Sequence, residues 1–212
     1  MTCAFMSGIV SYAMVGIVHE GADLQVDLAN GLMRGATQTA SPNCDARPAG
    51  VEPDLIVVHG ISLPPGEFGG PWIDLLFTNT LPAGAHPYFA QIAGMRVSSH
   101  LVIRRCGGIT QYVSFMERAW HAGKSAFDGR EACNDFSIGI ELEGADWVPY
   151  EAAQYESLAA AVAALCAAYP RLSAQRVVGH SDIAPGRKTD PGPAFDWPRA
   201  RKLIAGACTR PA

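Results

Sequence analysis

The sequence predicts a single α/β domain in which a central mixed β-sheet is flanked by helices. Short β-branched apolar runs alternate along the chain with segments of helical periodicity, which is typical of this class. Two of the runs are separated only by Cys106-Gly107-Gly108, a spacing that indicates an antiparallel hairpin. The hairpin places antiparallel neighbours in the sheet, so we expect the sheet to be mixed.

The composition supports one globular domain with a small-molecule partner. The chain has 212 residues, of which 49% are hydrophobic and 17% charged, so it can bury a sizeable core. The formal net charge is −4 and no run of Lys or Arg occurs. Nucleic acids and anionic membranes are therefore not expected partners, and we expect no stable membrane association.

The N-terminal part divides from the rest at about residue 25. Residues 3–18 form an apolar run with the length of a signal-peptide core, but they lack a positive flank, since the first basic residue is Arg34. We interpret residues 1–25 as a disordered extension or an incorrectly assigned start, with export or anchoring as the alternative. Residues 26–212 form the predicted domain.

The first half of the domain begins with a buried strand over 54–58, a β-branched run. Prolines and glycines then force an irregular loop over 63–71, and short helices are expected over 72–77 and 87–93. The hairpin strands are expected over 99–105 and 109–115.

The second half begins with a strand over 136–143, where apolar residues alternate with Ser, Gly and Glu. Apolar residues spaced by three and four predict a helix over 151–169, which Pro170 ends. A buried strand over 176–179 follows, and a last helix is predicted over 196–207 with Asp196 as its N-cap.

Three candidate metal ligands stand out by their context. His59 and His180 each follow a buried apolar strand, and Asp190 lies in a stiff Pro- and Gly-rich loop beyond His180. Two imidazoles and one carboxylate suit a tetrahedral zinc that keeps its fourth position open for water. Taken singly, a residue of this kind is more often a structural core or surface residue than a metal ligand.

A base and a cation are also available near these ligands. Glu141 and Glu143 share one face of their predicted strand, so spacing alone does not decide which one activates water. Gly139 on the same face is expected to leave room for a ligand. Lys188, two residues before Asp190, is placed to stabilise an oxyanion, or else is a solvated loop lysine.

Four motifs together resemble those of the AmpD-type amidases, which hydrolyse anhydromuramoyl peptides. They are residues 59–74 (HGISLPPGEFGGPWID), 118–123 (RAWHAG), 133–144 (CNDFSIGIELEG) and 179–197 (GHSDIAPGRKTDPGPAFDW). The resemblance runs from about Val26 to Leu203. It implies a cytoplasmic zinc hydrolase of peptidoglycan recycling that cleaves the lactyl–L-alanine amide of 1,6-anhydro-N-acetylmuramyl peptides.

The resemblance also implies a role for each matched residue. The implied zinc ligands are His59, His180 and Asp190, with Glu141 as catalytic acid and base and Lys188 on the oxyanion. Glu143 is then a supporting residue. The implied muropeptide contacts are Trp120, Phe77, Leu142, Arg96 and His121.

Two positions depart from the family pattern, and two other functions stay open. Gly60 stands where an Asn is usual, so one side-chain hydrogen bond to the substrate is expected to be missing. Ala132 stands where an Arg is usual, so selectivity for diaminopimelate stems is expected to be relaxed. The alternatives are an exported amidase that acts on the intact wall and a non-catalytic peptidoglycan-binding module. Retention of the complete ligand set favours hydrolysis over mere binding.

Overall fold

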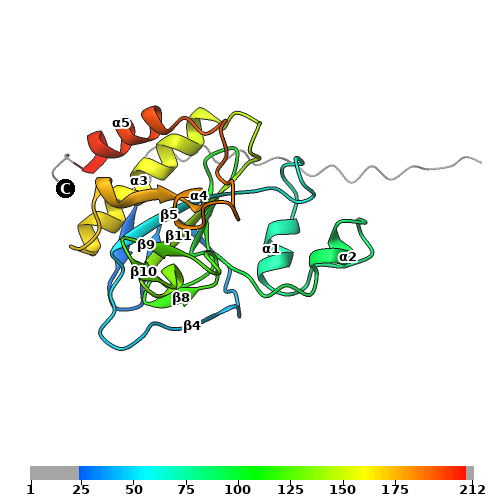
Figure 1. Ribbon diagram of the computed structural model, residues 1–212, viewed down its shortest axis with the longest axis horizontal. Helices are drawn as coiled ribbons and strands as arrows, with labels where there is room; N and C mark the ends of the chain where they lie inside the picture. The colour runs from blue at the N-terminus through cyan, green and yellow to red at the C-terminus, as the bar shows by residue number, and fades with distance from the viewer. Residues whose placement is uncertain (1–23, 209–212) are drawn as a thin grey trace, which may run out of the picture.

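A six-stranded mixed sheet forms the centre of the computed structural model, which describes residues 24–208 (Figure 1). The strand order is β12 (Val177–Gly179), β5 (Leu55–Ile61), β11 (Ser137–Glu143), β6 (Leu101–Ile103), β7 (Ile109–Gln111) and β3 (Thr37–Gln38). All neighbours are parallel except β6 and β7. The predicted mixed sheet is confirmed, whereas the apolar run 3–18 lies outside the described residues.

The strand boundaries differ from the predicted ones in an informative way. The hairpin pairs Leu101 with Gln111 and Ile103 with Ile109, as predicted, but both of its strands are shorter than expected. Strand β5, by contrast, continues past the apolar run to Ile61 because its last residues pair with the end of β11. His59 therefore lies inside a strand and not after one.

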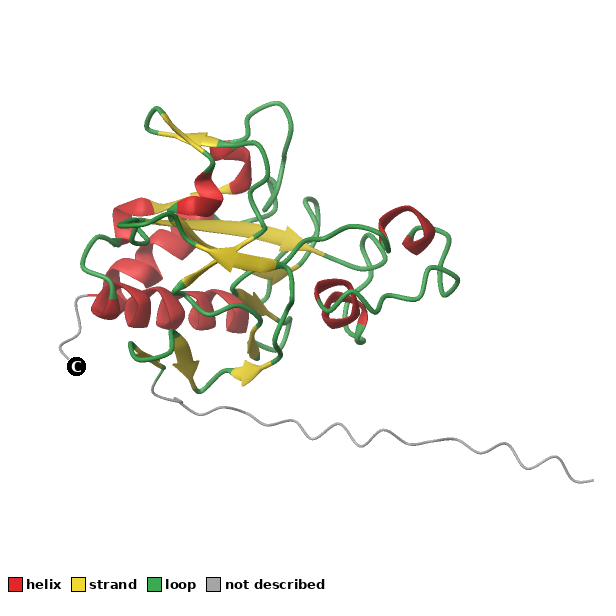
Figure 2. Ribbon diagram, turned by 90° about the horizontal axis from the view of Figure 1, so that it is seen from below, coloured by secondary structure: helices red, strands yellow, loops and turns green. Residues whose placement is uncertain are grey.

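Two long helices cover one face of the sheet, and two short helices stand apart from it. Helices α3 (Ala152–Ala168) and α5 (Trp197–Cys208) lie side by side against the strands (Figures 1 and 2). Helices α1 (Trp72–Phe77) and α2 (Phe89–Ile92) pack against each other away from this layer. None of the helices described in residues 24–208 is both long and apolar enough to cross a membrane.

Several short elements had no predicted counterpart. They are β1 (Gln25–Asp27), β2 (Leu32–Arg34), β4 (Cys44–Ala46), β8 (Glu117–Ala119), β9 (Ala126–Phe127), β10 (Arg130–Glu131), two 3₁₀ turns (Cys133–Asp135 and Ala174–Arg176) and α4 (His180–Ile183). Each has only two to four residues, so no hydrophobic period can develop within it. They form the loops and edges around the larger sheet.

The two faces of the sheet have different surroundings. Ile56, Val58, Ile138, Ile140 and Leu142 belong to the core cluster that α3 and α5 complete. On the opposite face, Leu55 and Val57 pack with residues of the 122–136 segment and of α4. Because side chains alternate along a strand, His59 and Glu141 point to this second face. Leu142, fully buried in the first cluster, points away from them.

Candidate active site

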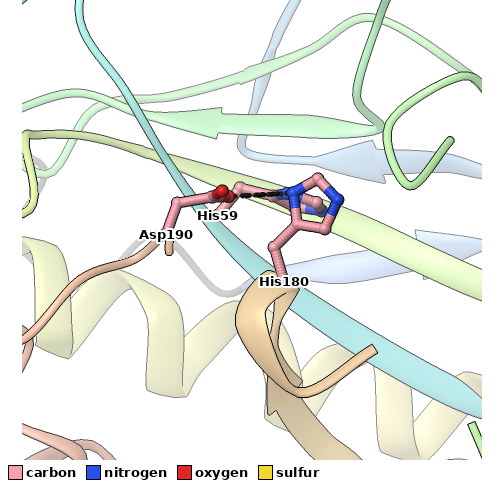
Figure 3. Close-up of side chains that lie close together, drawn as sticks. All are labelled: His59, His180 and Asp190. Atoms are coloured by element: carbon pink, nitrogen blue, oxygen red, sulfur yellow. Dashed lines mark hydrogen bonds and ion pairs between the residues drawn. The ribbon is translucent and has the colours of Figure 1, made fainter. Parts of the chain in front are cut away.

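Strand register brings the proposed base next to the first candidate metal ligand. Glu141 of β11 pairs directly with His59 of β5, so both side chains leave the same face of neighbouring parallel strands. His180 is the first residue of α4, which follows β12 on the other side of β5. Asp190 reaches the same place from the loop after α4 (Figure 3).

Three ligand atoms from these elements converge. The Nδ1 atoms of His59 and His180 are 2.9 Å apart, and Asp190 Oδ2 lies 3.2 Å and 3.0 Å from them. Ligand atoms around a tetrahedral zinc stand about 3.3 Å apart, which follows from Zn–N distances of about 2.0–2.1 Å. The spacing and the donor types therefore suit a zinc ion, and the predicted ligands are brought together.

Burial and hydrogen bonding act on the protonation of His59 and Asp190. Burial lowers the pKa of His59 to about 4, so the imidazole is neutral near pH 7 and has a lone pair to offer. For Asp190, burial alone would raise the pKa, but the two imidazoles outweigh it and hold that pKa well below its ordinary value. Neutral nitrogens and an ionised carboxylate form the protonation state that metal binding requires.

The two glutamates of β11, which spacing left equivalent, have different surroundings. Burial, and then the charge of Asp190, raises the pKa of Glu141 well above its ordinary value, while Lys188 opposes the rise. Its Oε2 atom is buried and has no hydrogen-bond partner among the described residues. The carboxylate of Glu143 accepts the backbone N–H groups of Gly69 (2.6 Å) and Arg105 (3.2 Å). Of the two, only Glu141 has an oxygen free for chemistry.

A cavity of about 380 Å³ opens over the cluster. The metal ligands, Glu141 and Lys188 line it, and so do the apolar side chains of Phe77, Trp120, Tyr88 and Ile92. Trp120 is half-buried and donates its Nε1–H to Asp45 Oδ1 at 3.2 Å. The cavity thus combines polar reacting groups with apolar lining residues, which suits a ligand with an amide and a sugar-like ring.

Two expected substrate contacts are not at this cavity. Leu142 is buried on the helix side of the sheet and is absent from the lining, so the structure does not bring it to this cavity. Arg96 is exposed, and its guanidinium lies 3.5 Å from the carbonyl oxygens of Gly94 and Met95. Its neighbours Met95 and Val97 line the cavity, but Arg96 itself does not.

The space expected at Gly139 is filled by the ring of His121. A Cβ atom at position 139 would lie 2.5–2.7 Å from three atoms of that ring, so only glycine fits. His121 lines the cavity but also lies behind His59, with its Nδ1 2.9 Å from His59 Nε2. Gly139 therefore makes room for a side chain of this protein, and the expectation of ligand space there was wrong.

The two departures from the family pattern also have structural surroundings. A Cβ atom at Gly60 would lie 2.4 Å from the hydroxyl of Tyr150, which donates to Pro191 O in the loop that carries Asp190. Ala132 has a left-handed backbone (φ 58°) and lines a second cavity of about 490 Å³ with Lys124, Glu131 and Arg187.

Sequence reasoning missed three residues that support the site. Asn134 accepts the backbone N–H of Ala122, and Ser137 bonds the ring of His121, which lies behind His59. Tyr150 donates to the carbonyl of Pro191, the residue after Asp190. Asn134 and Ser137 lie inside a quoted motif, 133–144, so their position in that motif was the available signal.

Comparison with known proteins identifies the family. The sequence profile of the N-acetylmuramoyl-L-alanine amidases matches residues 49–193, which is more than half of the chain. The chain belongs to the N-acetylmuramoyl-L-alanine amidase family. The predicted enzyme class, an amidase acting on a linear amide, is thereby confirmed.

Individual amidases of this family are similar over most of the chain. The 1,6-anhydro-N-acetylmuramyl-L-alanine amidase AmpD of Salmonella typhimurium is 62% identical over 170 residues, 80% of this chain and 90% of the relative. A crystal structure of an AmpD selenomethionine derivative superimposes with a TM-score of 0.81 at 59% identity, covering 84% of this chain and 98% of that one.

A more distant amidase of the family has been solved with a muropeptide. Escherichia coli AmiD, in complex with anhydro-N-acetylmuramic acid-L-Ala-D-γ-Glu-L-Lys, is 29% identical with a TM-score of 0.52. The match covers 85% of this chain and 65% of that chain.

Proposed function

We propose that the chain is a zinc-dependent amidase of peptidoglycan recycling, which hydrolyses the lactyl–L-alanine amide of 1,6-anhydro-N-acetylmuramyl peptides. The observation that carries the proposal is the buried carboxylate oxygen of Glu141, which has no hydrogen-bond partner in the described part of the chain and lies at the same cavity as His59, His180 and Asp190. The substrate class is supported by relatives about 60% identical that bear this activity in their names.

Each residue of the site then has a defined task. His59, His180 and Asp190 would hold zinc, which when bound acidifies water and polarises a carbonyl. Glu141 takes a proton from the attacking water and returns it to the alanine nitrogen, which leaves as an amine. Lys188, at the same cavity, stabilises the negative charge on the carbonyl oxygen. The apolar lining residues Phe77 and Trp120 receive the anhydro sugar.

The two alternatives make different demands on the protein. A buried carboxylate oxygen without a partner among residues 24–208 costs free energy, and a non-catalytic binding module would have no reason to keep it. An exported amidase would need residues 3–18 as its signal, and they lie outside the described residues. Cytoplasmic localisation stays a prediction, which cell fractionation with an antibody against the chain tests.

Mass analysis of products from a defined anhydromuropeptide tests the function, with elemental analysis of the same protein. We expect about one zinc per chain and two products, anhydro-N-acetylmuramic acid and the free peptide. Loss of turnover with a chelator and recovery with zinc would support the proposal. A metal-free protein that cleaves equally well with chelator present would overturn it, and so would a zinc-loaded protein that leaves the substrate intact.

A further inference from the structure

The Nε2 atoms of both candidate histidine ligands lie within hydrogen-bond distance of one dipeptide, His121–Ala122. His59 Nε2 lies 2.9 Å from Nδ1 of the His121 ring, and His180 Nε2 lies 3.2 Å from the carbonyl oxygen of Ala122. Neither His121 nor Ala122 belongs to the candidate ligand set. Two ligands from separate elements, β5 and α4, thus depend on one short stretch of chain.

Hydrogen-bond chemistry decides which group donates and which accepts in the series of hydrogen bonds behind His59. Ser137 Oγ lies 2.6 Å from the carbonyl oxygen of Cys133, which can only accept, so the hydroxyl proton points there. Ser137 Oγ therefore accepts from His121 Nε2, at 3.2 Å. A neutral His121 protonated on Nε2 has a bare Nδ1, which accepts from His59 Nε2. His59 then keeps its Nδ1 lone pair for a metal.

The carbonyl of Ala122 fixes the tautomer of His180 in the same way. A carbonyl oxygen only accepts, so His180 carries its proton on Nε2 and presents a bare Nδ1. Arg187 also donates to this carbonyl, at 2.7 Å, and holds it in place. Both imidazoles are thereby set in the tautomer that binds a cation through Nδ1.

The dipeptide is itself held from two sides. Asn134 Oδ1 accepts both of its backbone N–H groups, at 3.1 Å from His121 and 2.8 Å from Ala122. The ring of His121 fills the space above Gly139, where any side chain would displace it. Asn134 and Ser137 lie in one segment at the start of β11, so the strand that carries Glu141 also anchors this support.

We propose that Asn134 and Ser137 are positioning residues that set the tautomers of both histidine ligands through His121–Ala122. His121, expected from the resemblance to contact substrate, is in this view a support of the metal site. The proposal rests on zinc binding by the proposed function, since groups behind metal-bound histidines govern metal affinity.

Zinc affinity, measured on the full chain by competition with a chromogenic chelator, tests the proposal. Asn134→Ala and Ser137→Ala should each weaken zinc binding by about 10- to 100-fold, the usual effect of losing such a partner. Ser137→Ala removes only a hydroxyl and keeps the volume, so it covers the case in which Asn134→Ala fails to fold. Two-bond ¹H–¹⁵N spectra of the metal-free protein should show the Nε2-protonated tautomer for His59 and His180 in the wild type and a mixture of tautomers in the variants.

Asn43→Ala is the matched control. Asn43 is also buried and bonds two other segments, one through Phe77 and Asn79 and one through Val97, but touches neither histidine. It should lower thermal stability without changing zinc affinity. Equal zinc affinity of wild type, Asn134→Ala and Ser137→Ala would overturn the inference alone, and so would an equal loss in Asn43→Ala. A wild type that binds no zinc would overturn the proposed function as well.

Discussion

At the scale of the residue, the difference between Glu141 and Glu143 is one of hydrogen bonding. Both are acidic, both lie on β11 and both leave the same face. Two backbone N–H groups donate hydrogen bonds to the carboxylate of Glu143, and the guanidinium of Arg104 forms an ion pair with it at 3.5 Å. Glu141 is left with a buried oxygen that no described protein group satisfies. A general base needs such an oxygen, because a carboxylate held by donors is a poor proton acceptor.

Substitution of each glutamate by glutamine separates the two roles. Glu141→Gln keeps the shape but cannot take the proton, so turnover should fall roughly 10²- to 10⁴-fold with zinc content unchanged. Glu143→Gln should instead lower the free energy of unfolding by about 1–3 kcal/mol, because two N–H donors and a guanidinium lose a charged acceptor. Steady-state rates and urea unfolding of both variants measure this. An inactive Glu143→Gln beside a nearly normal Glu141→Gln, both folded and zinc-loaded, would reverse the assignment.

At the scale of the element, the loop between α4 and α5 carries both Lys188 and Asp190. Its conformation is set by contacts with chain far away in sequence. Tyr150 donates its hydroxyl to Pro191 O at 2.9 Å, and Ala194 N–H bonds Asp146 O at 2.9 Å. At Gly192 (φ 84°) a Cβ atom would lie 2.2 Å from Asp146 Cα, so a side chain is excluded twice, by backbone angle and by space.

Gly192→Ala should therefore displace the loop and weaken zinc binding. Gly186, in the same loop, has a similar backbone (φ 74°), but a Cβ atom there would meet nothing within 4 Å, so Gly186→Ala isolates the cost of the backbone angle. We expect Gly186→Ala to cost about 1–2 kcal/mol of stability, and Gly192→Ala to cost more and to reduce zinc affinity as well. Urea unfolding and chelator competition measure both. Indistinguishable variants would show that the contact with Asp146 does not hold the loop.

At the scale of the whole molecule, one face of the sheet forms the core and the opposite face carries the candidate active site. The face under α3 and α5 holds the core cluster that contains Leu142 and Leu165, both fully buried. The other face carries the metal cluster and the cavity. A change on the helix face should consequently affect stability and leave substrate binding alone.

Leu142→Ala tests this division, with Leu165→Ala of α3 as its matched partner. Both remove the same side chain from one core, so each should lower the free energy of unfolding by about 2–5 kcal/mol. In protein that remains folded, KM for the anhydromuropeptide should stay within about twofold of wild type for both, since neither side chain lines the cavity. A large rise in KM for Leu142→Ala alone would restore Leu142 as a substrate contact.

The sequence by itself determined the fold class, the hairpin and the long helices, because hydrophobic period and turn residues are local signals. Its motifs also singled out His59, His180 and Asp190, which the structure brings together. Even the burial of Leu142 could be read from the alternation along its strand, although the resemblance pointed to a substrate contact.

Only the tertiary structure decided how the two glutamates differ, what fills the space at Gly139 and where Arg96 lies. The contrast between the two glutamates depends on Gly69 and Arg105, whose backbone N–H groups bond Glu143, and the room at Gly139 depends on the ring of His121. These partners are distant along the chain, and strand spacing carries no information about them. Contacts of this kind arise from the packing of separate elements, so they appear only once the chain is folded.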